Sequence, residues 1–243
     1  MHNVEPHETG SKLSRWLTHQ FDEMTTAWIT MDPVETNLYD RPVYVVPHGD
    51  YEPIYGSGPA VTVDEGLVIC FGHIRRYKGL ERLVSVVRTA RSEYPLRLTI
   101  AGPPDDPELT RSLRKLSRIE SWFDLDARRL SDEDLARSIC SAELVVLPYE
   151  HLYNSGAAML ALTLSRPILL PATSMSRRLR AEVGSNWVHL YNQSLQSEDI
   201  LSALRSIRDS LSDSVPDLQL RSWTLLGEQF ATIYRDCLAS GVN

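Results

Sequence analysis

Short apolar segments alternate with longer amphipathic segments over most of this chain. Five short runs are rich in apolar residues, at 67–72, 96–101, 144–147, 168–170 and 187–190. Between the first two, apolar residues recur at helical spacing over 79–93. Strands that are apolar on both faces and alternate with helices are typical of a parallel sheet covered by helices on both sides. The pattern therefore predicts an α/β protein with a doubly wound parallel sheet.

The remaining elements complete this alternation. Further helices are expected at 106–119, 155–165, 197–211 and 217–238, and a short strand at 121–125. Ser131 and Asp134 form a capping-box pattern at the start of another helix. Before the alternating part, the sequence predicts a helix from Lys12 to Thr26, a strand within 42–47, and a linker at 52–64 that is rich in Pro and Gly.

Composition narrows the class of protein. The chain has 243 residues and a formal charge of −7, so no global basic field attracts nucleic acid or an anionic membrane. Local basic patches remain, and one lies within 111–118. Three distant cysteines are expected to be buried and reduced. No apolar run reaches the ~20 residues that span a bilayer, and the first residues are too polar for a signal peptide. We therefore expect a cytoplasmic protein that is at most peripheral to a membrane.

Candidate chemistry gathers in the loops that follow strands, where ligands of parallel sheets bind. The run 67–71 ends at Gly72, and Arg75 and Lys78 precede a helix that begins near Gly79. Main-chain N–H groups, the helix dipole and the two cations would all favour an anion here. We expect Arg75 and Lys78 to neutralise a diphosphate while Gly72 lets the backbone approach it. The alternative is a solvated basic turn.

A second loop follows the strand 144–147. It is polar and aromatic, and Ser155 and Gly156 then begin an Ala-rich helix. Asn154 or Ser155 can cap this helix, and the N–H groups of its first turn can receive the distal phosphate of the same ligand. The alternative is an ordinary capped helix.

The histidines give weaker signals. His48 follows a strand, and such a histidine is more often structural than catalytic, because the glycine and aspartate beside it form a turn by themselves. His2 and His7 lie near two glutamates, but their spacing fits no standard zinc pattern. We expect no metal site.

Together these segments resemble the donor-binding half of the GT-B glycosyltransferases, in particular the bacterial polysaccharide sugar transferases of the glycogen-synthase-like superfamily. The similarity runs from about Val43 to Tyr234, and its motifs are specific through their order and spacing. They are Pro47-His48-Gly49, Phe71 to Leu80, Ile100-Ala101-Gly102, Ala142 to Tyr149, Asn154-Ser155-Gly156 and Arg166-Pro167-Ile168.

The resemblance implies a Rossmann-like donor-binding domain over 56–243, with a remnant of the acceptor domain and an interdomain linker over 1–55. It implies that a UDP- or GDP-linked sugar serves as substrate, without metal or cofactor. The residues implied to bind this donor are Gly72, Arg75, Lys78, Gly102, Glu150, Asn154, Ser155 and Gly156. His2 and His48 are implied to line the reaction centre as catalytic residues, and Arg178 and Glu182 are weaker candidates.

Two departures from the family pattern stand out. Many members carry a pair of glutamates around the loop and helix at 148–160, but the chain has leucine at 160 and no glutamate at 152 or 153. Recognition of the nucleotide ribose is therefore in question. The acceptor domain is also largely missing. We expect a truncation, a misplaced start codon, or half of a two-chain enzyme.

The leading hypothesis is a hexosyltransferase-type enzyme of polysaccharide biosynthesis. It would transfer a sugar to a glycan or lipid-linked acceptor once an acceptor domain complements it. The alternative is a non-catalytic module that binds a nucleotide or pairs with another subunit. A third possibility is a doubly wound binding domain of unrelated function. An apolar face uncovered by the missing domain predicts self-association.

Overall fold

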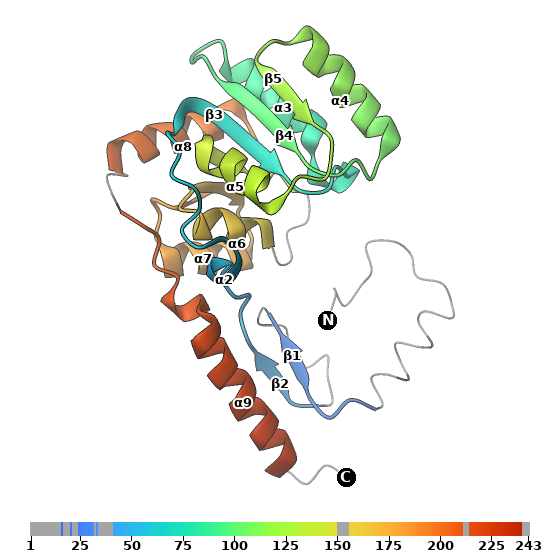
Figure 1. Cartoon of the computed structure of the whole chain (residues 1–243), viewed down its shortest axis with the longest axis vertical. Coiled ribbons are helices and arrows are strands. Elements are labelled where there is room, and N and C mark those ends of the chain that lie inside the picture. The colour runs from blue at the N-terminus through green and yellow to red at the C-terminus, as the bar shows by residue number, and fades with distance from the viewer. Residues whose placement is uncertain are drawn as a thin grey trace. The chain divides into compact units, whose positions relative to one another are not determined.

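The computed structural model describes residues 16, 20, 24–31, 33, 41–149, 156–210 and 214–239. Its internal contacts divide the chain into two compact units (Figure 1). One is Asp50–Leu218, and the other combines Met1–Gly49 with Gln219–Asn243. The helix expected from Lys12 to Thr26 falls mostly outside the described residues.

The larger unit is built on a six-stranded parallel sheet in the order β5-β4-β3-β6-β7-β8. The strands are β3 (Asp64–Phe71), β4 (Arg97–Ala101), β5 (Phe123–Asp126), β6 (Ala142–Val146), β7 (Ile168–Pro171) and β8 (Val188–Tyr191). All five neighbouring pairs are parallel. The predicted α/β fold with a parallel sheet is therefore confirmed.

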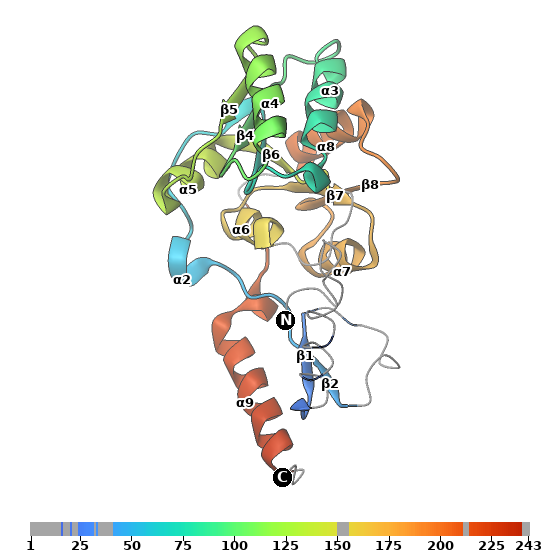
Figure 2. The ribbon, with the colours of Figure 1, turned by 90° about the vertical axis from the view of Figure 1, so that its right-hand side faces the viewer.

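Helices cover both faces of this sheet (Figure 2). They are α3 (Leu80–Ala90), α4 (Pro107–Ile119), α5 (Asp132–Ser141), α6 (Gly156–Thr163), α7 (Ser174–Val183) and α8 (Ser197–Ser210). The one-turn helix α2 (Glu52–Tyr55) precedes the first strand of this sheet. Alternate residues of β3 enter opposite cores: Val68 and Cys70 pack with α3 and α8, whereas Ile69 and Phe71 pack with α5, α6 and α7. The sheet is thus doubly wound, as its two-sided apolar strands predict.

Local corrections concern short elements and caps. The segment 52–64 was expected to be a linker, but it begins with the one-turn helix α2 and ends at the first residue of β3. At the expected capping box, the Ser131 hydroxyl accepts from the Asp134 N–H at 3.1 Å. A complete capping box opens α7, where Thr173 and Ser176 exchange both bonds. Serine at the third helical position replaces the usual glutamate, so the sequence pattern did not reveal it.

The smaller unit contains β1 (Trp28–Thr30), β2 (Val43–Val45), the 3₁₀ turn η3 (Gln219–Arg221) and α9 (Trp223–Ala239). β1 and β2 pair in parallel. Val46 from the first part of the chain packs with Leu226 and Ile233 of α9. The strand β1 was not predicted, because three residues are too few to show a period. In the described part of the chain, no helix is both long and apolar enough to cross a membrane.

Candidate functional site

The carboxyl ends of β3, β4 and β6 meet at one edge of the sheet, and glycines let their loops approach closely. Gly102 has a φ of 144°, and a Cβ there would lie 2.4 Å from the Gly72 carbonyl oxygen. Gly79 has a φ of 62°, and a Cβ there would lie 2.6 Å from the Pro148 carbonyl oxygen. Side chains at these two positions would push the three loops apart. The sequence-predicted residues Gly72 and Gly102 are thus brought together at this edge.

Lys78 is the buried cation of this edge. It ends the 3₁₀ turn η2 (Arg76–Lys78), and only 6% of the residue is exposed. Its Nζ donates to the Phe71 carbonyl oxygen at 3.3 Å and lies 5.2 Å from the centre of the Tyr149 ring. A Cβ at position 72 would lie 2.8 Å from Nζ, so the glycine leaves room for the ammonium group.

The charge of Lys78 is not neutralised by any side chain that the structure describes. No carboxylate of the described residues forms an ion pair with it. Burial lowers the pKa of Lys78, and the nearby Arg75 lowers it further, although Cys70 and Asp105 act in the opposite direction. A buried ammonium that contacts a carbonyl and an aromatic ring, and pairs with no described carboxylate, is suited to receive an anion.

Arg75 lies at the same edge but is already paired. Its Nε and Nη2 donate to Asp105 Oδ2 at 2.8 and 2.6 Å, and His73 Nδ1 lies 2.9 Å from the same oxygen. Hydrogen bonds from Arg75 and then from His73 lower the pKa of Asp105. The Arg75 side chain is 52% exposed, so an incoming anion competes with Asp105 for it.

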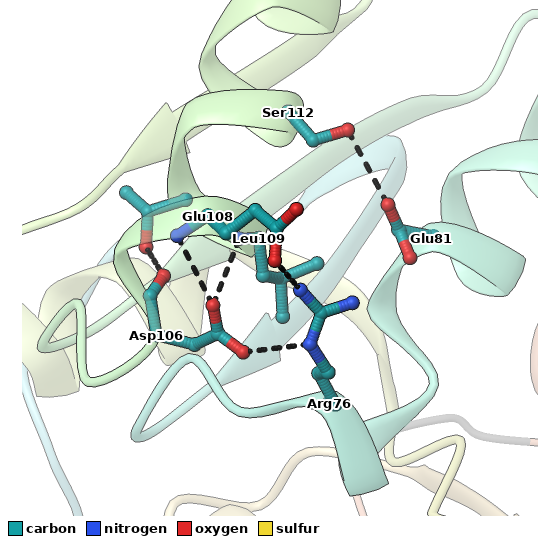
Figure 3. Close-up of polar contacts among 7 residues, drawn as sticks. Arg76, Glu81, Asp106, Glu108, Leu109 and Ser112 are labelled. Carbon is teal, nitrogen blue, oxygen red and sulfur yellow. Dashed lines mark hydrogen bonds and ion pairs between the residues drawn. The ribbon is translucent and has the colours of Figure 1, made fainter.

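Arg76 fastens the loop that carries Lys78 to the start of α4 (Figure 3). Asp106 caps α4 by accepting from the N–H groups of Glu108 and Leu109 at 3.1 and 2.9 Å. Arg76 Nε lies 3.0 Å from Asp106 Oδ2, and its Nη2 donates to Glu108 Oε2 at 2.5 Å. The start of α4 is therefore filled by a carboxylate of the chain itself. Sequence reasoning missed Asp105 and Asp106, although an aspartate directly before proline is a helix-start signal.

Four of the other predicted site residues cannot be placed relative to this cluster. Glu150, Asn154, Ser155 and His2 lie outside the described residues. Gly156 is the first residue of α6.

Three further candidates belong to other segments of the chain. His48 belongs to the smaller unit, where its Nδ1 lies 2.7 Å from the Gly49 carbonyl oxygen and its own carbonyl accepts from Arg221 at 3.3 Å. The weaker candidates Arg178 and Glu182 are residues of α7. Their roles remain predictions.

The amino ends of the strands carry a different set of charges. A cavity of about 580 Å³ there is lined in part by Glu65, Glu143, Arg166 and Arg208. Glu143 accepts from the Gly66 N–H at 2.6 Å and from Arg208 Nε and Nη2 at 2.6 and 2.8 Å. These bonds raise the pKa of Arg208. Every oxygen of the buried carboxylate therefore has a partner.

Comparisons with known proteins identify the relatives of this chain. No family model matches it. Two curated proteins from Xanthomonas campestris pv. campestris, each named GDP-mannose:glycolipid 4-beta-D-mannosyltransferase, are 31% identical to it over 241 residues. The match covers 98% of this chain and 68% of each relative.

Solved structures show the same fold at lower identity. A sucrose-phosphate synthase from Thermosynechococcus elongatus has a TM-score of 0.65 at 16% identity, over 98% of this chain and 65% of that one. A chain of the GtfA/B complex has a TM-score of 0.63 at 11% identity, over 93% of this chain and 48% of that one. This chain thus spans about two thirds of the first structure and about half of the second.

The sheet order, the glycine-lined carboxyl edge and these similarities agree with one another. The chain belongs to the GT-B-fold glycosyltransferases that include the GDP-mannose:glycolipid mannosyltransferases.

Proposed function

We propose that this chain is the donor-binding part of an enzyme that transfers a sugar from a nucleoside diphosphate sugar to a lipid-linked or other glycan acceptor. The names of the two curated relatives favour a GDP-linked donor over a UDP-linked one and a glycolipid acceptor. The diphosphate would bind at the carboxyl edge of the sheet, beside Lys78.

The observation that carries this proposal is the buried ammonium of Lys78. Keeping a buried charge without a counter-ion costs free energy, so the arrangement is best explained by an anion that binds there in the working protein. Because residue 72 has no side chain, an anion can approach the backbone beside Nζ closely. Arg75 supplies a second cation at the exposed rim of this site. A diphosphate carries enough charge to engage both.

These residues supply the electrostatic part of the transfer. When the glycosidic bond to the diphosphate breaks, negative charge grows on the departing phosphate. Lys78 would stabilise that charge from a site already shielded from water, and Arg75 would exchange Asp105 for a phosphate oxygen. Positioning of donor and acceptor supplies the rest of the rate. His48 remains our candidate for the reaction centre.

Calorimetric titration with GDP and with UDP, in the presence of a chelator, tests this proposal. We expect the wild-type chain to bind GDP in preference to UDP. We expect this binding to be lost in the Lys78→Met variant. Lys115→Met is the matched control, because Lys115 is an exposed lysine of α4 and lies outside the site. Failure of both nucleotides to bind a folded chain, or equal binding by wild type and Lys78→Met, would overturn the proposal.

A non-catalytic nucleotide-binding or subunit-pairing module is the second candidate function. The observation that favours it is Leu160, which is only 6% exposed and belongs to an apolar core. The family resemblance implies a glutamate near this position in many members. Such a module would bind GDP but transfer no sugar. An assay with a GDP-linked sugar and a lipid-linked acceptor, run with and without an added acceptor-domain chain, separates the two functions.

We also propose that an acceptor-binding part completes the enzyme, either as a further segment or as a separate subunit. Large apolar side chains exposed on α9 support a covering partner, since Tyr234 is 62% and Leu238 is 82% exposed. Self-association of the isolated chain is the expected sign of this face. Sedimentation over a range of concentrations checks it, and a Leu238→Glu variant should remain monomeric where the wild type associates.

A further inference from the structure

One face of α4 carries four cations. Arg111, Arg114, Lys115 and Arg118 are all exposed, and we refer to them as the basic face of α4. Their spacing of three, four and seven residues places them on a single side of the helix. At ~1.5 Å per residue, this face extends about 10 Å along the helix axis.

No residue of the basic face forms an ion pair with any described residue of the chain. Nearby carboxylates are engaged elsewhere, as Figure 3 shows for Asp106 and Glu108, which both bind Arg76. Glu81 instead accepts from Ser112 on another side of α4. At the far end of the helix, Glu120 binds Arg88.

Four like charges at helical spacing oppose folding. Each pair at three or four residues costs a few tenths of a kcal/mol. Their clustering also contrasts with the formal charge of the whole chain, which is −7. A face that disfavours folding and has no counter-charge among the described residues is best explained by an external anionic surface.

Ile119 indicates which kind of surface this is. It is 78% exposed and lies one helical turn beyond Lys115, at the border of the basic face. Cations beside an exposed apolar side chain match the boundary between lipid headgroups and acyl chains. A nucleic acid offers no apolar layer, and the overall negative charge of the chain repels a long polyanion.

We propose that the basic face of α4 docks on the anionic phospholipid headgroups of a bilayer, with Ile119 at the headgroup boundary. Docking would hold the donor-binding unit at a membrane surface, where a glycolipid acceptor resides. This purpose of docking rests on the proposed function, but the binding of α4 to phospholipid headgroups does not. α4 begins at the loop that follows β4, so the docked face and the donor edge belong to the same unit.

Vesicle co-sedimentation tests the proposal with the full chain and without nucleotide. The probes are phosphatidylcholine vesicles with and without phosphatidylglycerol, at low and high salt. We expect binding only to the vesicles that contain phosphatidylglycerol, and its loss at high salt. Each cation near an anionic bilayer strengthens binding roughly fivefold, so Arg114→Gln with Arg118→Gln should weaken it roughly 25-fold.

Two matched variants separate location from total charge. Arg137→Gln with Arg205→Gln removes the same charge from exposed arginines of α5 and α8 and should leave vesicle binding unchanged. Arg114→Lys with Arg118→Lys keeps the charge and should also bind. Circular dichroism checks that the helices persist in every variant.

Several outcomes overturn the proposal. They are equal binding to both kinds of vesicle, no binding at low salt, equal loss in the α5 and α8 control, and duplex DNA competing as strongly as phosphatidylglycerol vesicles. Because no nucleotide is present, these results are independent of the Lys78 titration. A chain that binds GDP but no vesicle would refute docking alone.

Discussion

The two edges of the larger sheet differ in how a buried charge is paired. At the amino edge, Glu143 is bonded to a backbone N–H and to both arms of the Arg208 guanidinium. At the carboxyl edge, Lys78 Nζ contacts a carbonyl oxygen and an aromatic ring, and no carboxylate of the described residues forms an ion pair with it. Both residues are 6% exposed. Equal burial with unequal pairing is the difference that we expect between a charge that stabilises the fold and one that binds a ligand.

The difference also explains why the amino-edge cavity is not our candidate donor site. Its buried carboxylate is already satisfied, and the arginine that satisfies it also stacks on Tyr94, 4.3 Å from the ring centre. Removing a partner there should harm folding. Removing Lys78 should harm binding and leave folding intact. The free energy of unfolding of variants at the two edges therefore distinguishes them.

The largest loss of stability is expected for Glu143→Ala. The change removes the hydrogen-bonding partner of Arg208 and leaves it a longer ion pair with Glu65 at 3.7 Å. We expect a cost of about 3 kcal/mol, the low end for a buried pair, because the guanidinium is partly exposed. Urea unfolding measures the cost. Glu133→Ala is the control, since its bridge to Arg137 is exposed on α5 and should contribute under ~0.5 kcal/mol. A similar cost for both variants would show that the pair of Glu143 and Arg208 contributes no more to stability than an exposed ion pair.

A second test concerns the close approach of loops at the carboxyl edge. Gly102→Ala should destabilise by about 2–3 kcal/mol, because the new Cβ meets the backbone of Gly72 and φ is 144°. Gly184→Ala is matched, because φ is 106° but no atom lies within 4 Å of the added Cβ. Strain alone should cost that variant about 1 kcal/mol. Thermal unfolding compares them, and equal losses would mean that loop contact plays no part.

The strands and helices of the larger unit were largely predictable from the sequence, because their apolar periods are local. Lys78 was also singled out, from its place between a strand-ending glycine and a helix. The partners of the charges were not predictable. Glu143 and Arg208 are 65 residues apart, and nothing near either residue indicates the other. Asp105 likewise meets Arg75 only after two strands pair side by side. Pairing decides whether a buried charge is structural, and pairing follows from the tertiary fold.

The smallest change in stability, with the opposite sign, is expected for Lys78→Met in the ligand-free chain. Methionine fills a similar space without a buried charge, so the free energy of unfolding at neutral pH should stay the same or rise by about 1 kcal/mol.

The pH dependence of this difference follows from the pKa of Lys78, which the folded chain lowers below its ordinary value of 10.5. Between the lowered pKa and 10.5, the unfolded chain binds more protons, so the penalty that Lys78 imposes shrinks as pH rises. The advantage of the variant should therefore be largest at neutral pH and fade as pH approaches 10.5. Urea unfolding of both chains at the two pH values measures it. A Lys78→Met chain that loses as much stability as Glu143→Ala would place Lys78 among the structural charges and remove the contrast between the two edges.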